Sequence, residues 1–206
     1  TLFRNTMTNN TYNFGVYGTT LQHFIHDANI SNTVDGKPTY YWVNQNNKQI
    51  PADAGYVAII NSSGIIAKDL NLQNNYQGLL LAYTRGSLIR NVNASSNRFG
   101  LYLDYSDNNI VNLNTISRNH YRGIYLFKSN GNTINENTIS NNELGIRLHY
   151  SSTNLISLNN FVNNTEQAYQ GLNSSNTWDN GAGKGNYWSN YMGVDSNNDG
   201  IGDTPY

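Results

Sequence analysis

Several residue types are missing or scarce in this sequence. It contains no cysteine, so neither a disulfide bond nor a thiolate metal site can form, although this absence is compatible with any cellular compartment. Charged residues make up only 12% of the chain, and the formal net charge is -1. Because phosphate contacts need clustered Lys and Arg, this composition argues against a nucleic-acid partner.

Long apolar runs and prolines are scarce too. No run of about 18 apolar residues occurs, so we expect neither a transmembrane segment nor a signal peptide in this sequence. Two of the 3 prolines, Pro38 and Pro51, lie within residues 33–54. Because proline is poorly tolerated inside a strand ladder, we expect this segment to leave the fold as a protruding insertion, or to cover an open edge as a flap.

The sequence does contain a repeat, which occurs four times within residues 74–150. Each repeat carries a glycine, and the four glycines lie 22, 23 and 22 residues apart: Gly78, Gly100, Gly123 and Gly145. An apolar, variable, apolar triplet follows each glycine, as in Leu79 to Leu81, and such alternation predicts a short strand with one face inward. A fixed period of this length indicates a solenoid. We therefore predict an all-β fold, a parallel β-helix with coils of about 22 residues.

Asparagine recurs at the bend before each strand. Asn tolerates left-handed backbone angles, and stacked amides can hydrogen-bond to one another, so we expect a ladder here formed by Asn75, Asn97, Asn119, Asn142 and Asn164. Residues 1–32 read as two looser coils, and Thr1 falls within a repeat, so we expect the chain to be part of something longer. The predicted interior also includes, among others, Ile89, Ile110, Leu113, Ile116 and Leu158.

A resemblance to a known family rests on three blocks: NTVDGKPTYYWVNQ with PADAGYVAIINSS, the Asn-rich coils, and NTWDNG…GNYWSNYMGVDSNNDGIGDTPY. In these the chain resembles NosD-like β-helix proteins with the carbohydrate-binding and sugar-hydrolase (CASH) repeat, which are abundant on archaeal cell surfaces, especially in methanogens. The resemblance implies a right-handed parallel β-helix, an extracellular or cell-surface location, and often membership of a larger protein. The family is labelled as copper-binding, but the resemblance does not imply that this chain binds copper. His23 and His26 would lie on opposite faces of a strand, and the sequence shows no cluster of copper ligands.

The last residues differ from the coils. We expect the β-helix to span residues 1–176 and a Gly-rich, aromatic C-terminal cap to span 177–206. Within the cap, the spacing of oxygen ligands matches a calcium loop, with the backbone carbonyl of Ile201 and the side chains of Asp195, Asn197, Asp199 and Asp203. Tyr206 stands where such a loop usually has Glu, so a hydrogen-bonded turn without an ion is the alternative.

The outward positions of the predicted strands form two columns. One consists of Leu80, Tyr102, Tyr125 and Arg147, and the other consists of Ala82, Asp104, Phe127 and His149. Tyr102, Tyr125 and Phe127 are candidates for stacking on sugar rings, although stacked aromatics also stabilise neighbouring strands. Asp104, Arg147 and His149 are the catalytic candidates of a carbohydrate-active enzyme, a polysaccharide lyase or a glycosidase. No second carboxylate joins them on this face, as a glycosidase pair would require.

Taken together, these features favour an extracellular structural or adhesive β-helix module over an enzyme. We expect it to bind polysaccharide, to contact copies of itself head to tail or upstream domains of a larger surface protein, and to be stiffened by calcium. Six sequons permit N-glycosylation outside the cell, at Asn9, Asn29, Asn61, Asn93, Asn163 and Asn173.

Overall fold

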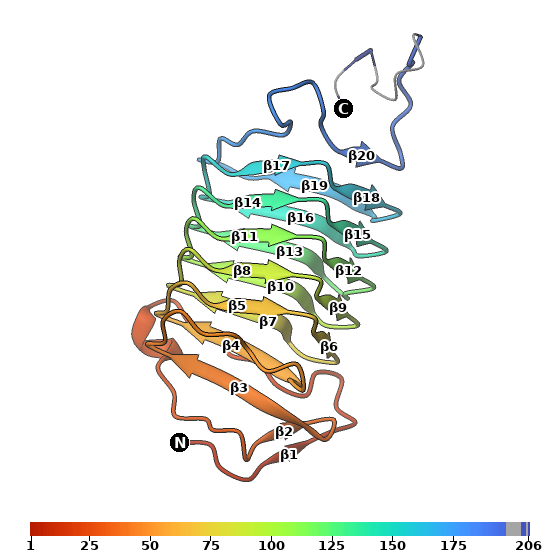
Figure 1. Ribbon diagram of the computed structural model, residues 1–206. Helices are drawn as coiled ribbons and strands as arrows, with labels where there is room; N and C mark the ends of the chain where they lie inside the picture. Colours follow the sequence, from red (N-terminus) through yellow and green to blue (C-terminus); the bar gives the residue numbers. More distant parts are fainter. Residues whose placement is uncertain (197–202, 205) are drawn as a thin grey trace.

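A computed structural model describes residues 1–196, 203–204 and 206, and in it the chain winds into a right-handed parallel β-helix (Figure 1). Three sheets run along the solenoid. The largest contains β1 (Thr6–Met7), β2 (Thr33–Val34), β3 (Lys37–Val43), β4 (Tyr56–Ile60), β7 (Gln77–Ala82), β10 (Phe99–Asp104), β13 (Arg122–Phe127), β16 (Leu144–His149) and β19 (Glu166–Gln170).

The other two sheets consist mostly of three-residue strands. One contains β5 (Ile66–Lys68), β8 (Leu88–Arg90), β11 (Ile110–Asn112), β14 (Thr133–Asn135) and β17 (Leu155–Ser157). The other contains β6 (Asn71–Gln73), β9 (Asn93–Ser95), β12 (Thr115–Ser117), β15 (Thr138–Ser140), β18 (Asn160–Val162) and β20 (Tyr187–Trp188). The described residues also include one short 3-10 helix, η1 (Leu21–Phe24), and no helix among them is long and apolar enough to cross a membrane.

The repeat sets the register of the coils, as predicted. Leu101 pairs with Leu79 on one side and with Ile124 on the other, so the apolar triplets stack in parallel. Equivalent side chains of successive coils lie 22 or 23 residues apart, as for Asn97 and Asn119 or Ser106 and Ser129. These parallel, in-register strands confirm the β-helix that the glycine period predicts.

The interior is apolar, but several predicted interior residues point outward instead. Leu79, Leu101, Ile124 and Ile146 are fully buried in one column of the core. In contrast, Ile110, Leu113 and Leu158 are 44%, 42% and 37% exposed. In a three-residue strand the middle residue faces the core, so Val111 and not Ile110 is buried in β11.

Asparagine ladders close the corners of the coils. The backbone N–H of Asn97 donates to the Oδ1 of Asn119 at 3.0 Å, and the Nδ2 of Asn119 donates to the Oδ1 of Asn142 at 3.0 Å. The predicted ladder is therefore present. Two further ladders, which the sequence did not reveal to us, run along other corners through Ser87, Asn109, Asn132, Asn154 and Asn176, and through Asn114, Asn137, Asn159 and Asn186.

Residues 33–54 do not protrude from the fold, in contrast to our expectation. Strand β3 pairs in parallel with β4, and equivalent side chains of the two coils lie 17 residues apart. This segment is thus a shortened first coil. Pro38 is accommodated near the start of β3, in a short antiparallel hairpin with β2, so it does not interrupt the parallel pairing of Thr39 to Val43. Tyr40 and Trp42 pack against the end of the core.

Much of the first thirty residues also differs from the expected coils, because residues 12–25 cross the outer face of the large sheet. We call this segment the strap. The N–H of Tyr76 donates to the carbonyl of Phe14 at 2.8 Å, and Gln77 exchanges hydrogen bonds with the backbone of Val16. Gly15 permits this approach, because a Cβ there would collide with Tyr76. The strap covers a second apolar cluster, in which Phe24 and Leu80 are fully buried.

Aromatic rings continue the core beyond the last coil. Trp188 stacks on Phe161 at a centroid distance of 4.5 Å, and Tyr206 stacks on Trp188 at 4.3 Å. Trp178 packs against the same cluster. The Gly-rich and aromatic C-terminal segment therefore covers the last coil, as a solenoid end requires.

Candidate functional site: an aromatic and basic groove beside the strap

A groove of about 280 Å³ lies where the strap crosses the outward columns of β10 and β13. Strap residues form one side of it and the large sheet forms its floor. Its lining residues are Tyr17, Gly18, Thr19, Phe99, Tyr102, Tyr105, Arg122, Tyr125, Phe127 and Lys128. We refer to this feature as the groove.

The floor of the groove is aromatic because the outward columns stack in register. Tyr102 pairs with Tyr125 across neighbouring strands, and their rings stack at 4.9 Å with an interplanar angle of 15°. Phe99 stacks on both rings, at 5.7 and 6.0 Å. Tyr102 is only 4% exposed, whereas Tyr17 on the strap is 68% exposed. The groove thus has a floor of stacked, mostly buried rings and an exposed tyrosine at its rim.

Two cations line the groove. The Arg122 guanidinium lies 4.1 Å from the ring centres of both Tyr121 and Tyr125, and its side chain is buried. Burial lowers the pKa of Arg122, and the neighbouring Arg147 lowers it further. Lys128 is exposed, and its Nζ donates to the Tyr105 hydroxyl at 2.6 Å. This hydrogen bond raises the pKa of Lys128.

Tyr105 and Lys128 reach the groove from the turn that follows each strand. Both have left-handed backbone angles, with φ of 47° and 48°. Asn61, Tyr83 and Tyr150 adopt the same conformation at the equivalent point of other coils. The conformation therefore belongs to the turn of the solenoid, which projects one side chain per coil over the outer face.

Asp104 lies beneath this surface and does not line the groove. It is 1% exposed, and its Oδ1 has no hydrogen-bond partner. Burial raises the pKa of Asp104 to about 7, although its hydrogen bond with Tyr102 and the charge of Lys128 act in the opposite direction. The carboxyl group therefore keeps its proton to a much higher pH than an exposed aspartate does.

The three catalytic candidates are not brought together. Asp104 pairs with Phe127 and Phe127 pairs with His149, so the two titratable groups lie two strands apart, roughly 10 Å. Arg147 lies in the neighbouring column, where it pairs with Tyr125. Burial and the charges of Arg147 and then Arg122 lower the pKa of His149.

The glycan candidates Tyr102, Tyr125 and Phe127 do share the groove, but sequence reasoning missed several of its other members. Arg122 occupies the position before the repeat glycine, where the paired residues Phe99 and Leu144 are also buried. The sequence signal that could have identified Arg122 is an arginine at a position that is buried in the neighbouring coils. Tyr17 could not be found in this way, because the repeat does not reveal where the strap runs.

The sequence profile of the family described as "Periplasmic copper-binding protein (NosD)" matches residues 3–193. The chain belongs to the NosD family. No curated protein sequence matches it. Among solved structures, this NosD-family chain is similar to a mutant of the periplasmic alginate epimerase AlgG, with 24% identity and a TM-score of 0.48 over 63% of this chain and 29% of that one.

A further similar structure is the A-module of the mannuronan C-5 epimerase AlgE6 from Azotobacter vinelandii. Its identity is 12% and its TM-score 0.33, over 72% of this chain and 58% of that one. The NosD-family chain therefore spans less than two thirds of the length of either structure, and these similarities concern the fold alone.

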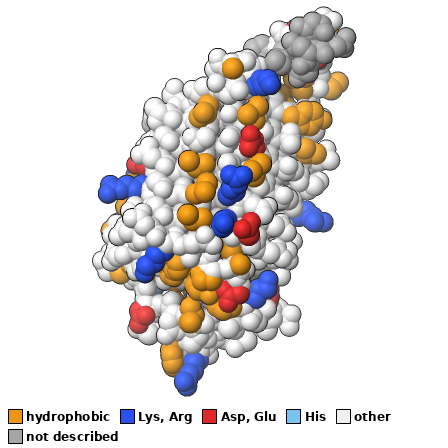
Figure 2. All heavy atoms as spheres, in the orientation of Figure 1, with side chains coloured by type: hydrophobic (Ala, Val, Ile, Leu, Met, Phe, Trp, Pro, Cys, Tyr) orange, Lys and Arg blue, Asp and Glu red, His pale blue; other side chains and the backbone are white. Residues whose placement is uncertain are grey.

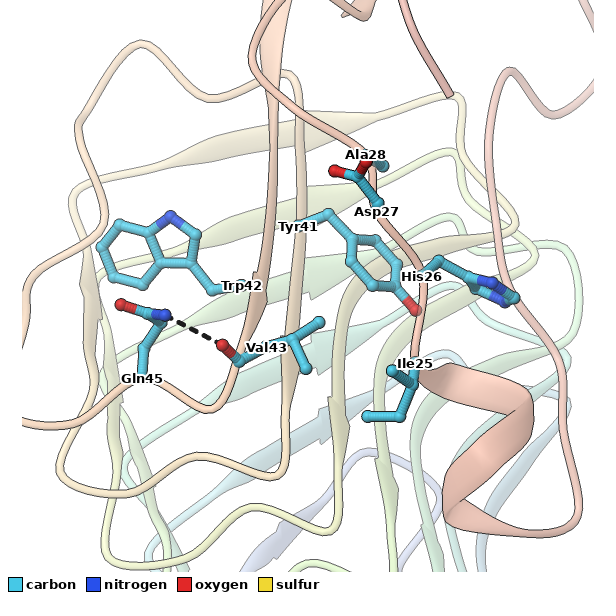
Figure 3. A pocket seen from close by; sticks show the side chains of 8 residues that line it. All are labelled: Ile25, His26, Asp27, Ala28, Tyr41, Trp42, Val43 and Gln45. Atoms are coloured by element: carbon cyan, nitrogen blue, oxygen red, sulfur yellow. Dashed lines mark hydrogen bonds between the residues drawn. The ribbon is translucent and has the colours of Figure 1, made fainter. Parts of the chain in front are cut away.

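A second hollow, of about 500 Å³, lies at the N-terminal end of the NosD-family chain (Figure 3). Tyr41 and Ile25 face each other there, and Trp42 lies on the opposite side of β3. The Tyr41 hydroxyl donates to the carbonyl of Phe24, and the Gln45 amide donates to the carbonyl of Val43 at 2.8 Å. The polar groups here mainly hold the strap and the edge of β3 in place.

Of the predicted calcium loop, Asn197, Asp199 and Ile201 lie outside the described residues. Asp203 lies within them, and its Oδ2 accepts hydrogen bonds from the N–H and the hydroxyl of Ser196, at 3.0 and 2.6 Å. These bonds lower the pKa of Asp203. They link the two ends of the loop that Asp195 begins.

Most sequons of this NosD-family chain lie at accessible turns. Asn93 is the half-buried one, and its Nδ2 donates to Asn71 at 3.1 Å. The other five are exposed, namely Asn9, Asn29, Asn61, Asn163 and Asn173. Four of these five have a left-handed backbone, so turn geometry accounts for asparagine at these positions without a glycan.

Proposed function

We propose that this NosD-family protein is a carbohydrate-binding module of the cell envelope or cell surface, and that saccharides bind in the groove. The stacked rings of Tyr102 and Tyr125, with Tyr17 opposite them, carry this proposal. One face of a sugar ring is apolar and packs on aromatic rings, while hydroxyl and charged groups at the rim orient it. The word "periplasmic" in the family description supports a location outside the cytoplasm.

Copper, which the family description names, does not fit the donors of this chain. Copper prefers thiolate, thioether and imidazole ligands, and the chain has no Cys, four His and two Met. Within the described part of the chain, no group of three His, Asp or Glu side chains could hold a metal ion. His120 lies 3.1 Å from the Tyr12 hydroxyl, and His149 lies in another part of the sheet beside Phe127. We therefore propose a function that requires no copper.

We propose binding and not catalysis as the role of the groove. A glycosidase needs two carboxyl groups beside the scissile bond. Among the described residues that line the groove there is neither Asp nor Glu, and the buried Asp104 lies below its floor. A polysaccharide lyase or glycosidase remains the alternative, and release of reducing or unsaturated sugars from polysaccharides would favour it.

The binding proposal is tested with Tyr17→Ala, measured by glycan array and by calorimetry with the saccharide that the array selects. Tyr17 is 68% exposed, so its removal should leave thermal stability unchanged while it weakens binding about 3- to 10-fold, as loss of an aromatic contact does. The matched control is Tyr187→Ala, a 58% exposed tyrosine of the cap. Equal affinity of both variants and the wild type would contradict the proposal.

Self-association at the N-terminal end is a second proposal. Strand β3 pairs with β4 along one edge. On its other edge β2 pairs with Lys37 and Pro38 and the N–H of Thr39 donates to the carbonyl of Asn32, but no described strand pairs with residues 40–43 there. A strand edge without a partner is a template for another chain, here a second copy or an upstream domain. Sedimentation velocity over a wide concentration range tests the first of these, and a monomer throughout would contradict it.

Four finer expectations stay predictions. The CASH repeat and an archaeal origin come from the resemblance, whereas glycosylation comes from the sequons and adhesion from the β-helix architecture. Calcium binding by the C-terminal loop is likewise a proposal, and its test is given below.

A further inference from the structure

The charged side chain of Arg122 is almost completely buried. It is only 7% exposed, yet it lines the groove. One of its terminal nitrogens donates to the Tyr121 hydroxyl at 2.8 Å, while its Nε has no acceptor and no carboxylate pairs with it among the described residues. A buried charge without a counter-ion is costly, so this position favours a negatively charged ligand.

Arg147 adds a second cation on the next strand. Its guanidinium lies 6.0 Å from the ring centre of Tyr125 and 5.1 Å from that of Tyr169, and its buried Nε also lacks an acceptor. Arg122 lies on the same Tyr125 ring at 4.1 Å. Two guanidinium groups that have no carboxylate partner among the described residues thus lie beside one aromatic ring.

Two tyrosine rings hold the Arg122 guanidinium in place. The Tyr121 and Tyr125 ring centres each lie 4.1 Å from the guanidinium carbon, and the Nε of Arg122 has no hydrogen-bond acceptor among the described residues. The edge of a guanidinium matches the two oxygens of a carboxylate or a sulfate. Lys128 contributes a third positive charge at the rim of the groove.

We infer that the saccharide bound in the groove is acidic, and that Arg122, with Arg147 beside it on the next strand, holds its carboxylate or sulfate group while the half-buried ring of Tyr125 and the exposed ring of Tyr17 pack on the sugar. This inference rests on the proposed function, since it names the chemical class of the ligand for the same groove. It predicts that charge, and not only ring stacking, selects the ligand.

The test compares three oligosaccharides of equal length: an oligogalacturonate, a sulfated oligosaccharide and a neutral gluco-oligosaccharide. Calorimetry at low salt should give the wild type at least about 10-fold higher affinity for one or both acidic ligands than for the neutral one. Arg122→Gln should lower affinity for the acidic ligand about 10- to 100-fold, and by a clearly larger factor than it lowers affinity for the neutral one. Arg118→Gln, a change at an exposed arginine, is the matched control and should alter neither.

The outcomes separate this inference from the proposed function. If neutral and acidic ligands bind equally and Arg122→Gln changes neither, the ligand is not acidic, although saccharide binding stands. If no saccharide binds the wild type in this assay or on a glycan array, both proposals fail. Should Arg122→Gln not fold, Arg147→Gln and the salt dependence of the wild type decide. Affinity for an acidic ligand that does not fall with rising salt would overturn the inference.

Discussion

The Nδ2 of Asn137 donates a hydrogen bond of 2.8 Å to the Oδ1 of Asn159, one coil further along the solenoid. The same amide donates to the carbonyl of Val111 at 2.9 Å, and its Oδ1 accepts from the backbone N–H of Asn114 at 3.0 Å. Asn137 therefore links three consecutive coils. Because it is fully buried, no water can replace these partners.

We predict that Asn137→Leu is strongly destabilising. The change leaves the N–H of Asn114 and the carbonyl of Val111 buried without these partners, and each such loss costs about 1 to 3 kcal/mol. The free energy of unfolding, measured by denaturant titration, should fall by at least about 2 kcal/mol. Asn160→Ala, at an exposed position of β18, is the control, and a similar effect of both changes would show that the ladder contributes little.

Gly123→Ala should also destabilise the fold, for a steric reason. A Cβ at this position would lie 2.6 Å from the carbonyl oxygen of Gly145 and 2.9 Å from the Nδ2 of Asn142. The neighbouring coil would have to shift, and overpacking of this kind costs about 1 to 3 kcal/mol. In Gly185→Ala the new Cβ would meet only the Trp178 carbonyl, at 3.4 Å, so its melting temperature should stay near that of the wild type. The prediction is wrong if the two variants melt together.

Stability should depend on pH through Asp104. Its pKa is raised to about 7 in the folded protein, above the value of 3.8 expected for an unfolded chain, so the folded state binds its proton more tightly. This contribution is complete below pH 3.8 and is lost as the pH rises towards 7, by about 1.4 kcal/mol per pH unit at most. The contribution of Asp104 to the free energy of unfolding therefore decreases as the pH rises from 3.8 to about 7.

Asp104→Asn tests this dependence. The amide carries no charge to bury, so the variant should be more stable than the wild type at pH 8 and should lose the downward slope between pH 4 and 7. Urea titrations at several pH values measure both effects. Asp69→Asn, at an exposed position, controls for the general effect of removing a carboxylate. Parallel pH profiles of the wild type and Asp104→Asn would refute the assignment.

Calcium should raise the thermal stability of the wild type if the C-terminal loop binds it. This gain in thermal stability should disappear on addition of a chelator. It should be smaller in Asp195→Asn and in Asp203→Asn, because each change replaces a negatively charged carboxylate ligand with a neutral amide. Magnesium at the same concentration is the control for ionic strength. Identical melting curves with calcium and with chelator would leave the loop as a hydrogen-bonded turn around Ser196 and Asp203.

The coils were predictable because each depends on local signals that recur. The glycine of each repeat and the alternation that follows it set the strand and its register, and the Asn before it indicates a corner. In β11 the same logic failed, since Ile110 and Val111 are both apolar and only the turn geometry decides which one faces the core. The shortened first coil was missed because its length, with side chains 17 residues apart, does not match the period.

The groove was only half predictable. Tyr102, Tyr125 and Phe127 follow from the alternation of the strands, but the other side of the groove comes from the strap. The contact of Val16 with Gln77 joins segments 61 residues apart and has no counterpart in the repeat. On the face shown in Figure 2, Lys, Arg, Asp and Glu side chains are few and scattered, in keeping with the low charge of the sequence. The density of charged residues along the sequence therefore could not indicate that Arg122 belongs to a site.

The strap changes how this chain can fold. In an ordinary solenoid each coil contacts only its neighbours, so structure can spread from any point. Here Tyr12 meets His120, 108 residues later, so the strap reaches its final place only after the coil with His120 has formed. During synthesis residues 12–25 leave the ribosome before the coils that they cover and yet dock after them, and the closure of so long a loop slows folding. The coils up to His120 should form one cooperative unit with the strap, while the later coils can open and close independently.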